Sequence, residues 1–405
     1  MQKRPVFIIL LFINYIFLLC ADTPPHLKAE AAVVVDVDTH EIIYAKDMDR
    51  QMYPASLTKL LTALLLAEYK KPGDVLVYSA AAKAVDPYKL DLLPGEELYA
   101  RDAMSGLLLF SANDIAYMIA ENIAGDVDAF AGLMNEKAES LHLTGSHFVN
   151  PHGLHDDNHY STAYDLSVIL REICIYPWIM ETTGKKEDTI ITLMNHRFEI
   201  MNRNKLVQIE GCIGGKTGWT PEAGRNLAAL YERESRRLAA VVLKSEYDRY
   251  DTVVFQDMGT LIDWAYARAP DQIFAAGETV RRLITRYKLL PYIGPEREIE
   301  IPVVVNRAVL EYTADPGLEI KTTFSAISVW KLNRAEPVGA LIVSGREIQH
   351  KYLLYPTFSA ADIFKKGLPF YGFLLAVFFF ILTVSLLLRS LFFKPGKTRK
   401  AVSGS

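Results

Sequence analysis

The stretch Tyr53-Pro54-Ala55-Ser56-Leu57-Thr58-Lys59-Leu60-Leu61 decides how the first half of the chain is organised. Leucines continue after it at helical spacing, and Pro54 is well placed just before a first helical turn. The pattern therefore predicts a helix that begins near Ser56. Residues i and i+3 of a helix share one face, with Cβ atoms about 5–6 Å apart, so the Ser56 hydroxyl and the Lys59 amine can meet.

A serine and a lysine at this spacing are a candidate nucleophile and its base. A serine hydroxyl reacts only when a neighbouring base takes its proton, and a lysine acts as that base only when its pKa is lowered. The tetrapeptide alone is weak evidence, because Ser328-Val329-Trp330-Lys331 has the same pattern. That second copy lies in a β-rich region, where a strand would send Ser328 and Lys331 to opposite faces.

The regions around this helix predict an α+β domain. Residues 31–46 are two β-rich runs joined through Asp38-Thr39-His40, which indicates a hairpin. Residues 99–171 are mostly helical by pattern, with breaks near Ser111, Gly125 and 150–153. Residues 211–243 return to strands. A sheet built from the start and end of a region, with helices inserted between, is typical of the α+β class. We expect an antiparallel sheet with helices over residues 22–272.

The composition changes after an amphipathic stretch at residues 261–267. Short valine, isoleucine and tyrosine runs alternate with turn residues, which predicts a small all-β domain over residues 273–360. Residues 368–388 are apolar and uncharged, close to the roughly 20 residues that a membrane-spanning helix needs. Residues 389–405 form a basic tail, and positive flanks stay on the cytoplasmic side. We therefore expect a single-pass protein of the cell membrane with its folded domains on the extracytoplasmic side.

The N-terminus has the order of a secretory signal peptide. Lys3 and Arg4 precede an apolar run that ends in small residues at Cys20 and Ala21. Residues 1–21 are read as a signal peptide, with an uncleaved signal anchor as the alternative. If Cys20 is removed, Cys174 and Cys212 remain, either as thiols or as one disulfide.

The overall charge excludes one class of partner. The formal net charge is −4, and basic residues are scattered outside the tail. This composition has no electrostatic footprint for nucleic acid. His152, His155 and His159 crowd one loop with Asp156 and Asp157, but no helical register fixes their spacing. We therefore predict no metal and no cofactor.

Two further short motifs raise the specificity of the serine–lysine pair. Ser111-Ala112-Asn113 supplies a hydroxyl and an amide at a helix boundary, and Lys216-Thr217-Gly218 supplies a cation, a hydroxyl and a residue without a side chain. With Ser56 to Lys59 they resemble the Ser-x-x-Lys, Ser-Asp-Asn and Lys-Thr-Gly set of penicillin-binding proteins and class A β-lactamases. Ala112 departs from that set, in which an aspartate stands at this position.

The resemblance extends through the segments that follow in order: Ser111-Ala112-Asn113-Asp114, Met134-Asn135-Glu136-Lys137-Ala138, Asn150-Pro151-His152-Gly153-Leu154 and Tyr160-Ser161-Thr162-Ala163. Over roughly residues 31–358 the chain is similar to the D-alanyl-D-alanine carboxypeptidase family of low-molecular-mass penicillin-binding proteins. The resemblance implies a serine β-lactamase-like catalytic domain followed by a small β domain. Many relatives end in an amphipathic surface helix, so a full membrane span is a departure.

The resemblance also implies roles for individual residues. Ser56 would form an acyl-enzyme with the penultimate D-alanine, Lys59 would be the base, and Ser111 would relay a proton to the leaving amine. Asn113 would bind the peptide backbone, and Lys216 and Thr217 would hold the terminal carboxylate. Gly218 would let the substrate lie close along the strand. Trp219 and Ser56 would supply oxyanion N–H groups. Arg203 is a candidate for the carboxyl end of the substrate, with a surface or salt-bridge arginine as the alternative.

The expected function is a serine-type D-Ala-D-Ala carboxypeptidase that trims peptidoglycan pentapeptide stems and is acylated by β-lactam antibiotics. A DD-endopeptidase or transpeptidase on the same scaffold stays open, because it differs only in the amine released or accepted. A β-lactamase needs a carboxylate to activate water, and no Glu-x-x-Leu-Asn segment lies between Ser111 and Lys216. The non-enzymatic alternative is a β-lactam-sensing or wall-binding module on a membrane tether.

Overall fold

A computed structural model of the 405-residue chain describes residues 23–290 and 293–392. The predicted signal peptide and the basic tail beyond residue 392 lie outside the described residues. The chain divides into two compact units. Unit 1 runs to Asp271 and takes in two later loops, Tyr312–Leu318 and Ser344–Ile348, whereas unit 2 holds the remainder from Gln272 onward.

Unit 1 is built on a five-stranded antiparallel sheet with the strand order β2-β1-β9-β8-β7. The predicted hairpin at its edge is confirmed, and the strands predicted after residue 211 complete the sheet. The first and last thirds of the unit therefore pair side by side, as expected for an α+β fold. The strands are β1 (Ala31–Asp36), β2 (Ile42–Lys46), β7 (Cys212–Thr220), β8 (Gly224–Arg233) and β9 (Arg236–Ser245).

Both faces of this sheet are buried, which explains why its central strands are apolar almost throughout. In β1 the side chains of Val33 and Val35 enter one core and that of Val34 enters the other. In β9 Val241 and Val242 divide in the same way. Successive side chains of a strand point to opposite faces, so each strand serves two cores. Burial of this kind contributes about 25 cal/mol per Å² of apolar surface.

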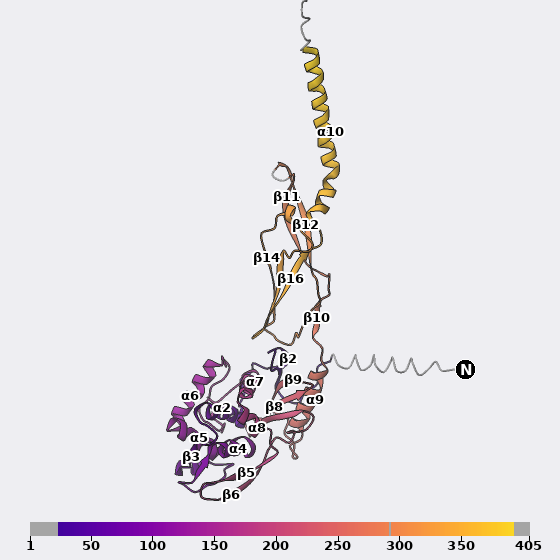
Figure 1. The fold of residues 1–405 in the computed structure, drawn as a ribbon. Coiled ribbons are helices and arrows are strands. Elements are labelled where there is room, and N and C mark those ends of the chain that lie inside the picture. Colours follow the sequence, from indigo (N-terminus) through magenta and orange to yellow (C-terminus); the bar gives the residue numbers. More distant parts are fainter. Residues whose placement is uncertain (1–22, 291–292, 393–405) are drawn as a thin grey trace, which may run out of the picture. The chain divides into compact units, whose positions relative to one another are not determined.

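Helices cover the two faces unequally. Helix α9 (Val253–Ala267) packs on the face that holds Val34 and Val242, while α2 (Lys59–Tyr69) and α7 (Ala163–Glu172) lie on the other side (Figure 1). Every residue of α2 from Lys59 to Leu66 is buried, so α2 is the central helix of unit 1. The remaining helical segments are α3 (Ala80–Ala84), α4 (Ala100–Ser105), η2 (Gly106–Phe110), α5 (Asn113–Ala124), α6 (Val127–Ser140), η3 (Ile173–Ile175) and α8 (Pro177–Thr183).

The helical prediction for residues 99–171 is confirmed only in part. Helices end at two of the three predicted breaks, where Ser111 and Gly125 adopt positive φ angles of 73° and 91°. However, no helix occupies residues 141–162, because turns and isolated bridges fill this stretch. Two small hairpins complete the unit: β3 (Val75–Val77) with β4 (Glu97–Tyr99), and β5 (Glu187–Ile191) with β6 (Arg197–Met201).

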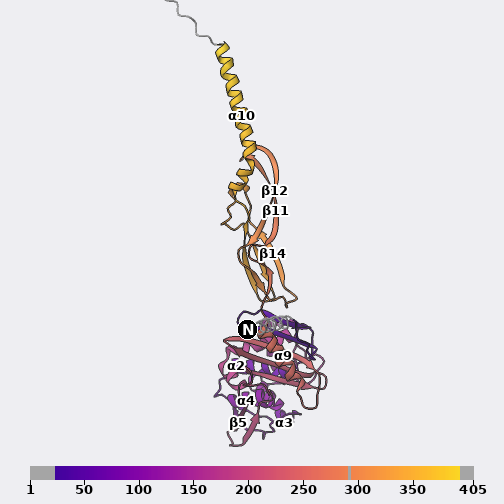
Figure 2. The same cartoon turned by 90° about the vertical axis from the view of Figure 1, so that its right-hand side faces the viewer.

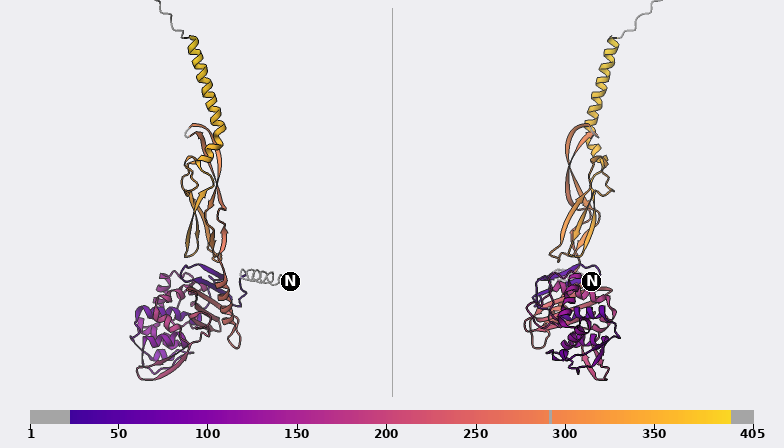
Figure 3. Two further views of the ribbon diagram at one scale, coloured as in Figure 1. Left: turned by 45° about the vertical axis from the view of Figure 1, so that its right-hand side comes forward. Right: turned by 90° about the vertical axis from the view of Figure 1, so that its left-hand side faces the viewer.

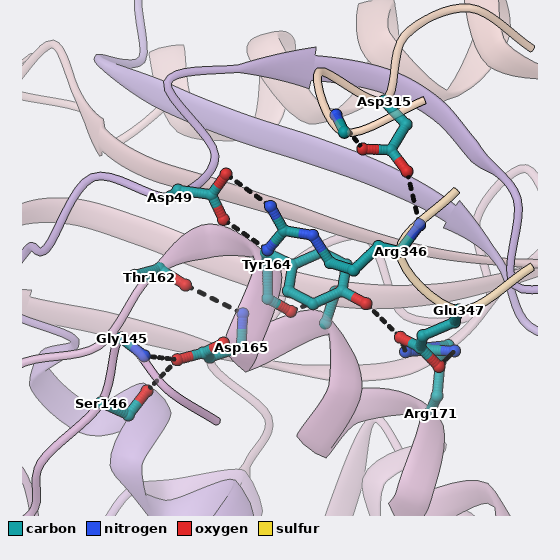
Figure 4. A network of polar contacts seen from close by, with 12 residues as sticks. Asp49, Gly145, Ser146, Thr162, Tyr164, Asp165, Arg171, Asp315, Arg346 and Glu347 are labelled. Carbon is teal, nitrogen blue, oxygen red and sulfur yellow. Dashed lines mark hydrogen bonds and ion pairs between the residues drawn. The ribbon is translucent and has the colours of Figure 1, made fainter. Parts of the chain in front are cut away.

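The later loop Ser344–Ile348 joins unit 1 through a charged network (Figure 4). The Arg346 guanidinium donates to both carboxylate oxygens of Asp49, at 2.6 and 2.7 Å, and lies 4.3 Å from the centre of the Tyr164 ring. Glu347 accepts from Arg171 at 2.5 Å and from the Tyr164 hydroxyl. A segment remote in sequence thus fixes the outer side of α7.

Helix α7 begins with a side-chain cap at Thr162. The Thr162 hydroxyl accepts from the Asp165 N–H at 3.0 Å, and the Asp165 carboxylate accepts from Gly145 and Ser146 (Figure 4). Thr162 and Asp165 therefore have a structural role at the N-terminus of the helix. Cys174 and Cys212 are free thiols and do not form the disulfide that was the other alternative.

Unit 2 is a β structure that ends in a long helix, and its β11–β12 and β12–β16 pairs are antiparallel. Its five-stranded sheet has the order β11-β12-β16-β15-β14, and β10 (Asp271–Phe274) pairs with β13 (Val309–Glu311). The sheet strands are β11 (Thr279–Leu290), β12 (Ile293–Val305), β14 (Glu319–Phe324), β15 (Gly339–Ser344) and β16 (Gln349–Pro356). Helix α10 (Ala360–Phe392) follows, and its 33 residues extend beyond the predicted span at both ends.

One prediction about unit 2 is wrong. The second Ser-x-x-Lys copy does not lie on a strand, because Val329–Lys331 forms a single 3₁₀ turn, η4, after Ser328. The Lys331 N–H donates to the Ser328 carbonyl at 2.9 Å, and both side chains are exposed. What separates this copy from the one at Ser56 is exposure to water, not the alternation of a strand.

Candidate active site

Ser56 and Lys59 lie where a 3₁₀ turn, η1 (Ala55–Thr58), runs directly into α2. Lys59 Nζ is 3.0 Å from Ser56 Oγ, which confirms that this spacing brings the two groups together. Lys59 is fully buried, whereas Ser56 lines a cleft of about 340 Å³. The hydroxyl is therefore accessible to a substrate while its base is shielded from water.

The other two contacts of the lysine fix the direction of its lone pair. Lys59 Nζ donates to Asn113 Oδ1 at 2.6 Å and to the His152 carbonyl at 2.7 Å. A carbonyl oxygen can only accept, so these two partners use both N–H groups of a neutral amine. The Asn113 orientation is fixed in turn, because its Nδ2 donates to the Pro87 carbonyl at 2.7 Å. The remaining lone pair of Lys59 then faces Ser56 Oγ, as a general base requires.

Burial and charge both favour that neutral amine. Burial lowers the pKa of Lys59 well below its ordinary value, and the positive charges of Lys216 and Arg203 lower it further. Burial and Arg203 also lower the pKa of Lys216, to about 7. Desolvation and neighbouring cations disfavour the ammonium form. The site therefore holds one lysine in a form that can accept a proton beside another that is charged below about pH 7.

The loop at residues 150–153 forms the back wall behind Ser56 and Lys59. The Thr62 hydroxyl donates to the Pro151 carbonyl at 2.6 Å, and the Asn150 side chain accepts from the Gly153 N–H at 2.7 Å. Gly153 has a φ of +82°, and a Cβ there would lie 1.9 Å from the Ala55 carbonyl oxygen. Only glycine allows the loop to approach the nucleophile turn this closely.

The histidines of the next stretch serve that wall. The Val149 N–H donates to His159 Nδ1 at 3.1 Å, so the other nitrogen carries the proton and donates to Thr58 Oγ1 at 2.8 Å. Burial lowers the pKa of His159 to about 4 and that of His152 to about 3. Both rings are therefore neutral near pH 7. The His159 ring binds this stretch to η1, and His152 Nδ1 accepts from the Leu154 N–H at 3.1 Å within the loop, so both rings have structural roles.

Ser111 enters the cleft from a strained position. It follows the π-helical turn η2 in the left-handed region and lines the same cleft as Ser56. Asn113, two residues on, is buried against Lys59 rather than among the residues that line the cleft. Its expected contact with the substrate backbone stays a prediction, whereas its contact with the lysine is a role that the motif did not reveal.

The buried side chain of Asp114 stabilises the start of α5. Its buried carboxylate accepts from the Tyr78 hydroxyl at 2.9 Å and from the N–H groups of Leu90 and Asp91 at 3.0 Å. Because Leu90 and Asp91 belong to the loop between α3 and β4, Asp114 binds that loop to the start of α5. Tyr88, in the same loop, lines the cleft.

Strand β7 forms the opposite wall and carries the second cation. Lys216 is buried, and its Nζ donates to the Thr217 carbonyl at 3.0 Å. Thr217, Gly218 and Trp219 line the cleft with Ser56. A Cβ on Gly218 would lie 2.9 Å from the Pro54 carbonyl and 3.2 Å from the Ser56 nitrogen. The missing side chain therefore lets β7 lie against the nucleophile turn.

Arg203 lines the cleft, so it lies where a contact with the carboxyl end of a substrate would be formed. Its Nε donates to the Phe110 carbonyl at 2.7 Å, and its guanidinium lies 4.6 Å from the centre of the Tyr88 ring. It forms none of the ion pairs found among the described residues, and its charge reaches both site lysines. The guanidinium is thus held beside the cleft by uncharged partners.

Sequence reasoning missed a second arginine, Arg225 on β8. Its guanidinium lies between the rings of Trp219 and Tyr247, at 5.0 and 5.3 Å from their centres, and pairs with Asp251 at 2.8 Å. Arg225 and Asp251 both line the cleft. One feature of the sequence could have predicted this neighbour of Trp219. Arg225 stands six residues after Trp219, across a turn, and it pairs with Trp219 between β7 and β8.

The sequence of this chain is similar to those of known D-alanyl-D-alanine carboxypeptidases. A sequence model of the D-alanyl-D-alanine carboxypeptidase family matches residues 20–246. D-alanyl-D-alanine carboxypeptidase DacF of Bacillus subtilis is 34% identical over 221 residues, which cover 53% of this chain and 57% of that protein. DacB2 of Mycobacterium tuberculosis is 30% identical over 249 residues, which cover 61% of this chain and 85% of that protein. The chain thus spans little more than half the length of the Bacillus relative.

The fold is also similar to those of solved D-alanyl-D-alanine carboxypeptidase structures. A D-alanyl-D-alanine carboxypeptidase from Mycobacterium tuberculosis superposes with a TM-score of 0.58 at 29% identity, covering 62% of this chain and 95% of that chain. The carboxypeptidase DacD from Francisella tularensis superposes with a TM-score of 0.62 at 21% identity, covering 83% and 94%. At that identity the second similarity concerns the fold alone.

Proposed function

Because this chain belongs to the D-alanyl-D-alanine carboxypeptidase family, we propose that it removes the terminal D-alanine from peptidoglycan pentapeptide stems through an acyl-enzyme on Ser56. The observation that carries the proposal is the buried Lys59 amine, 3.0 Å from the Ser56 hydroxyl, with its N–H groups bound to carbonyl oxygens. β-Lactams would acylate the same serine, because they present a strained amide to the same nucleophile.

In the acylation step Lys59 takes the Ser56 proton as Oγ attacks the carbonyl of the penultimate D-alanine. The tetrahedral intermediate then expels the terminal D-alanine, whose nitrogen must gain a proton. Ser111 lines the cleft beside Ser56 and would relay that proton from the lysine. Water then hydrolyses the ester and returns the serine. Positioned proton transfer of this kind contributes about 10²–10⁴ in rate.

Two cations would select a free carboxyl terminus. Thr217 and Arg203 line the cleft, and Lys216, which is buried next to Thr217 in β7, would hold the substrate carboxylate together with Thr217. The approach of β7 to the nucleophile turn at Gly218 supports a role for the Ser56 and Trp219 N–H groups as the oxyanion hole. One such donor is worth about 10²–10³ in rate.

Helix α10 supplies a candidate membrane anchor. It is long and apolar enough to cross a bilayer. We infer that it spans the cell membrane with both units on the extracytoplasmic side, where a wall substrate lies. The basic residues that follow it in the sequence favour this orientation.

The proposal is tested by incubating the purified full chain with a labelled penicillin and, separately, with a peptide that ends in D-Ala-D-Ala. Wild type should become labelled and release D-alanine, and Ser56→Ala should do neither. Ser328→Ala is the matched control, since it removes the serine of the second Ser-x-x-Lys copy, and it should behave as wild type.

The same assays separate the alternatives. A transpeptidase or endopeptidase would be labelled but would release D-alanine only with an acceptor amine or from a cross-linked peptide. A β-lactamase would turn over penicillin without accumulating label. Stable labelling without any release of D-alanine would leave a sensing module, and labelling of Ser56→Ala would refute the serine assignment.

A further inference from the structure

The exposed turn η4, which has no part in the proposed chemistry, packs against the start of α10 within unit 2. The Ala360 N–H donates to the Leu332 carbonyl at 2.9 Å, and Val329 and Ile363 are each 2% exposed. Arg334 pairs with Asp362 at 3.0 Å. The helix therefore starts at a fixed place on the β structure, without a free linker between them.

Aromatic rings gather where these parts meet. The Trp330 and Tyr287 rings lie 6.1 Å apart, and Trp330 Nε1 donates to the Lys288 carbonyl at 3.1 Å, which ties η4 to the end of β11. On the helix, Phe364 stacks on Tyr371 at 4.9 Å. Figures 2 and 3 place the end of the β11–β12 pair beside the first turns of α10 from three directions.

The position of these rings along the helix matters. The apolar run begins at residue 368, so Phe364 stands one turn before it and Tyr371 stands within its first turn. One helical turn rises 5.4 Å, which is close to the thickness of one headgroup layer, about 5–7 Å on each side of the hydrocarbon core. Rings that contact or neighbour this part of α10 therefore come to the level of the headgroups.

The charged residues near the start of α10 also fit a position in the headgroup layer. Exposed lysines stand at 288, 331, 365 and 366. The acids nearest to them in these segments are Glu296, which faces Lys288 across the strands, Glu336, which accepts from Asn333, and Asp362, which is paired with Arg334. Mixed aromatic and basic residues are typical of the membrane–water interface, where a ring is buried in part and a cation meets phosphate.

We propose that the collar formed by η4, the end of β11 and residues 360–371 lies in the headgroup layer of the outer leaflet, with Trp330 as its principal anchor. The proposal rests on the inferred membrane span of α10 and adds a second, peripheral contact from the β structure itself. The occupant is a phospholipid headgroup layer, because the collar is continuous with the apolar helix that enters the same bilayer.

The chain offers a direct optical test. Of its four tryptophans, Trp178, Trp219 and Trp264 belong to unit 1, α10 contains none, and Trp330 alone lies in unit 2. The full chain is reconstituted in phosphatidylcholine–phosphatidylglycerol vesicles that contain a lipid brominated near the headgroup, and tryptophan emission is compared with that in unbrominated vesicles. Trp330→Phe keeps an aromatic ring, and Trp178→Phe is the matched control.

Wild type and Trp178→Phe should be quenched by the brominated lipid, and Trp330→Phe should lose at least three quarters of that quenching. Undiminished quenching in Trp330→Phe, or none in wild type, overturns the collar. Extraction of the vesicles with alkaline carbonate tests separately whether α10 spans the membrane, because a spanning protein resists extraction. Protein that resists extraction but is not quenched contradicts the collar alone, whereas protein released by carbonate contradicts both the span and the collar.

Discussion

Replacing Gly153 with alanine is the sharpest test of how the back wall holds the nucleophile. The new Cβ would lie 1.9 Å from the Ala55 carbonyl oxygen, and ordinary contact begins at about 3.4 Å, so the two backbones must separate by about 1.5 Å. Overpacking of this kind costs about 1–3 kcal/mol. A left-handed alanine adds roughly 1–2 kcal/mol.

The expected result is a loss of both stability and acylation. A destabilisation of about 2–5 kcal/mol corresponds to a fall in the melting temperature of roughly 4–20 °C for a domain of this size. A shift of about 1 Å at a reacting group costs on the order of 10²-fold in rate. The acylation rate with labelled penicillin should therefore fall by about 10² or more, measured well below the lowered melting temperature.

Gly132→Ala is the control for the chemistry of the change. Gly132 lies in helix α6, and a Cβ there meets nothing within 4 Å. This variant should be as active as wild type and more stable by about 0.5–1 kcal/mol. If Gly153→Ala acylates within threefold of wild type, the close approach of the loop does not position Ser56, and the reasoning fails.

Three further outcomes follow from the charges. The pKa of Lys216 near 7 means that its positive charge is lost as the pH rises, so kcat/KM for a free-carboxyl peptide should fall above about pH 7, and Lys216→Arg should move that fall to higher pH. Glu347→Gln removes the partner of Arg171 and should lower the free energy of unfolding by roughly 1–3 kcal/mol in denaturant titrations. The folded pKa of His159, near 4, lies below its unfolded pKa of about 6.5. The neutral ring therefore makes its full contribution to the free energy of unfolding above about pH 6.5, and about 3 kcal/mol of it is lost as the pH falls to about 4. His159→Gln should flatten that part of the curve of stability against pH.

The second Ser-x-x-Lys copy shows where local reasoning stopped. The sequence predicted a strand at residues 328–331, yet tertiary contacts to α10 hold the segment as a 3₁₀ turn. Short segments have weak intrinsic preferences, so packing decides their conformation. The break at Ser111 and the cap at Thr162 were predictable, because each depends on residues within a few positions of one another.

The sequence by itself determined that Ser56 and Lys59 share one side of a helix start, that alternating strands form an antiparallel sheet, and that an apolar helix closes the described chain. These features follow from periodicities of a few residues. The tertiary structure alone decided what surrounds the lysine: the Asn113 oxygen, the His152 carbonyl and the charge of Lys216 come from segments far apart in sequence. A lysine becomes a base only through desolvation and the direction of its partners, and both depend on how distant parts of the chain pack.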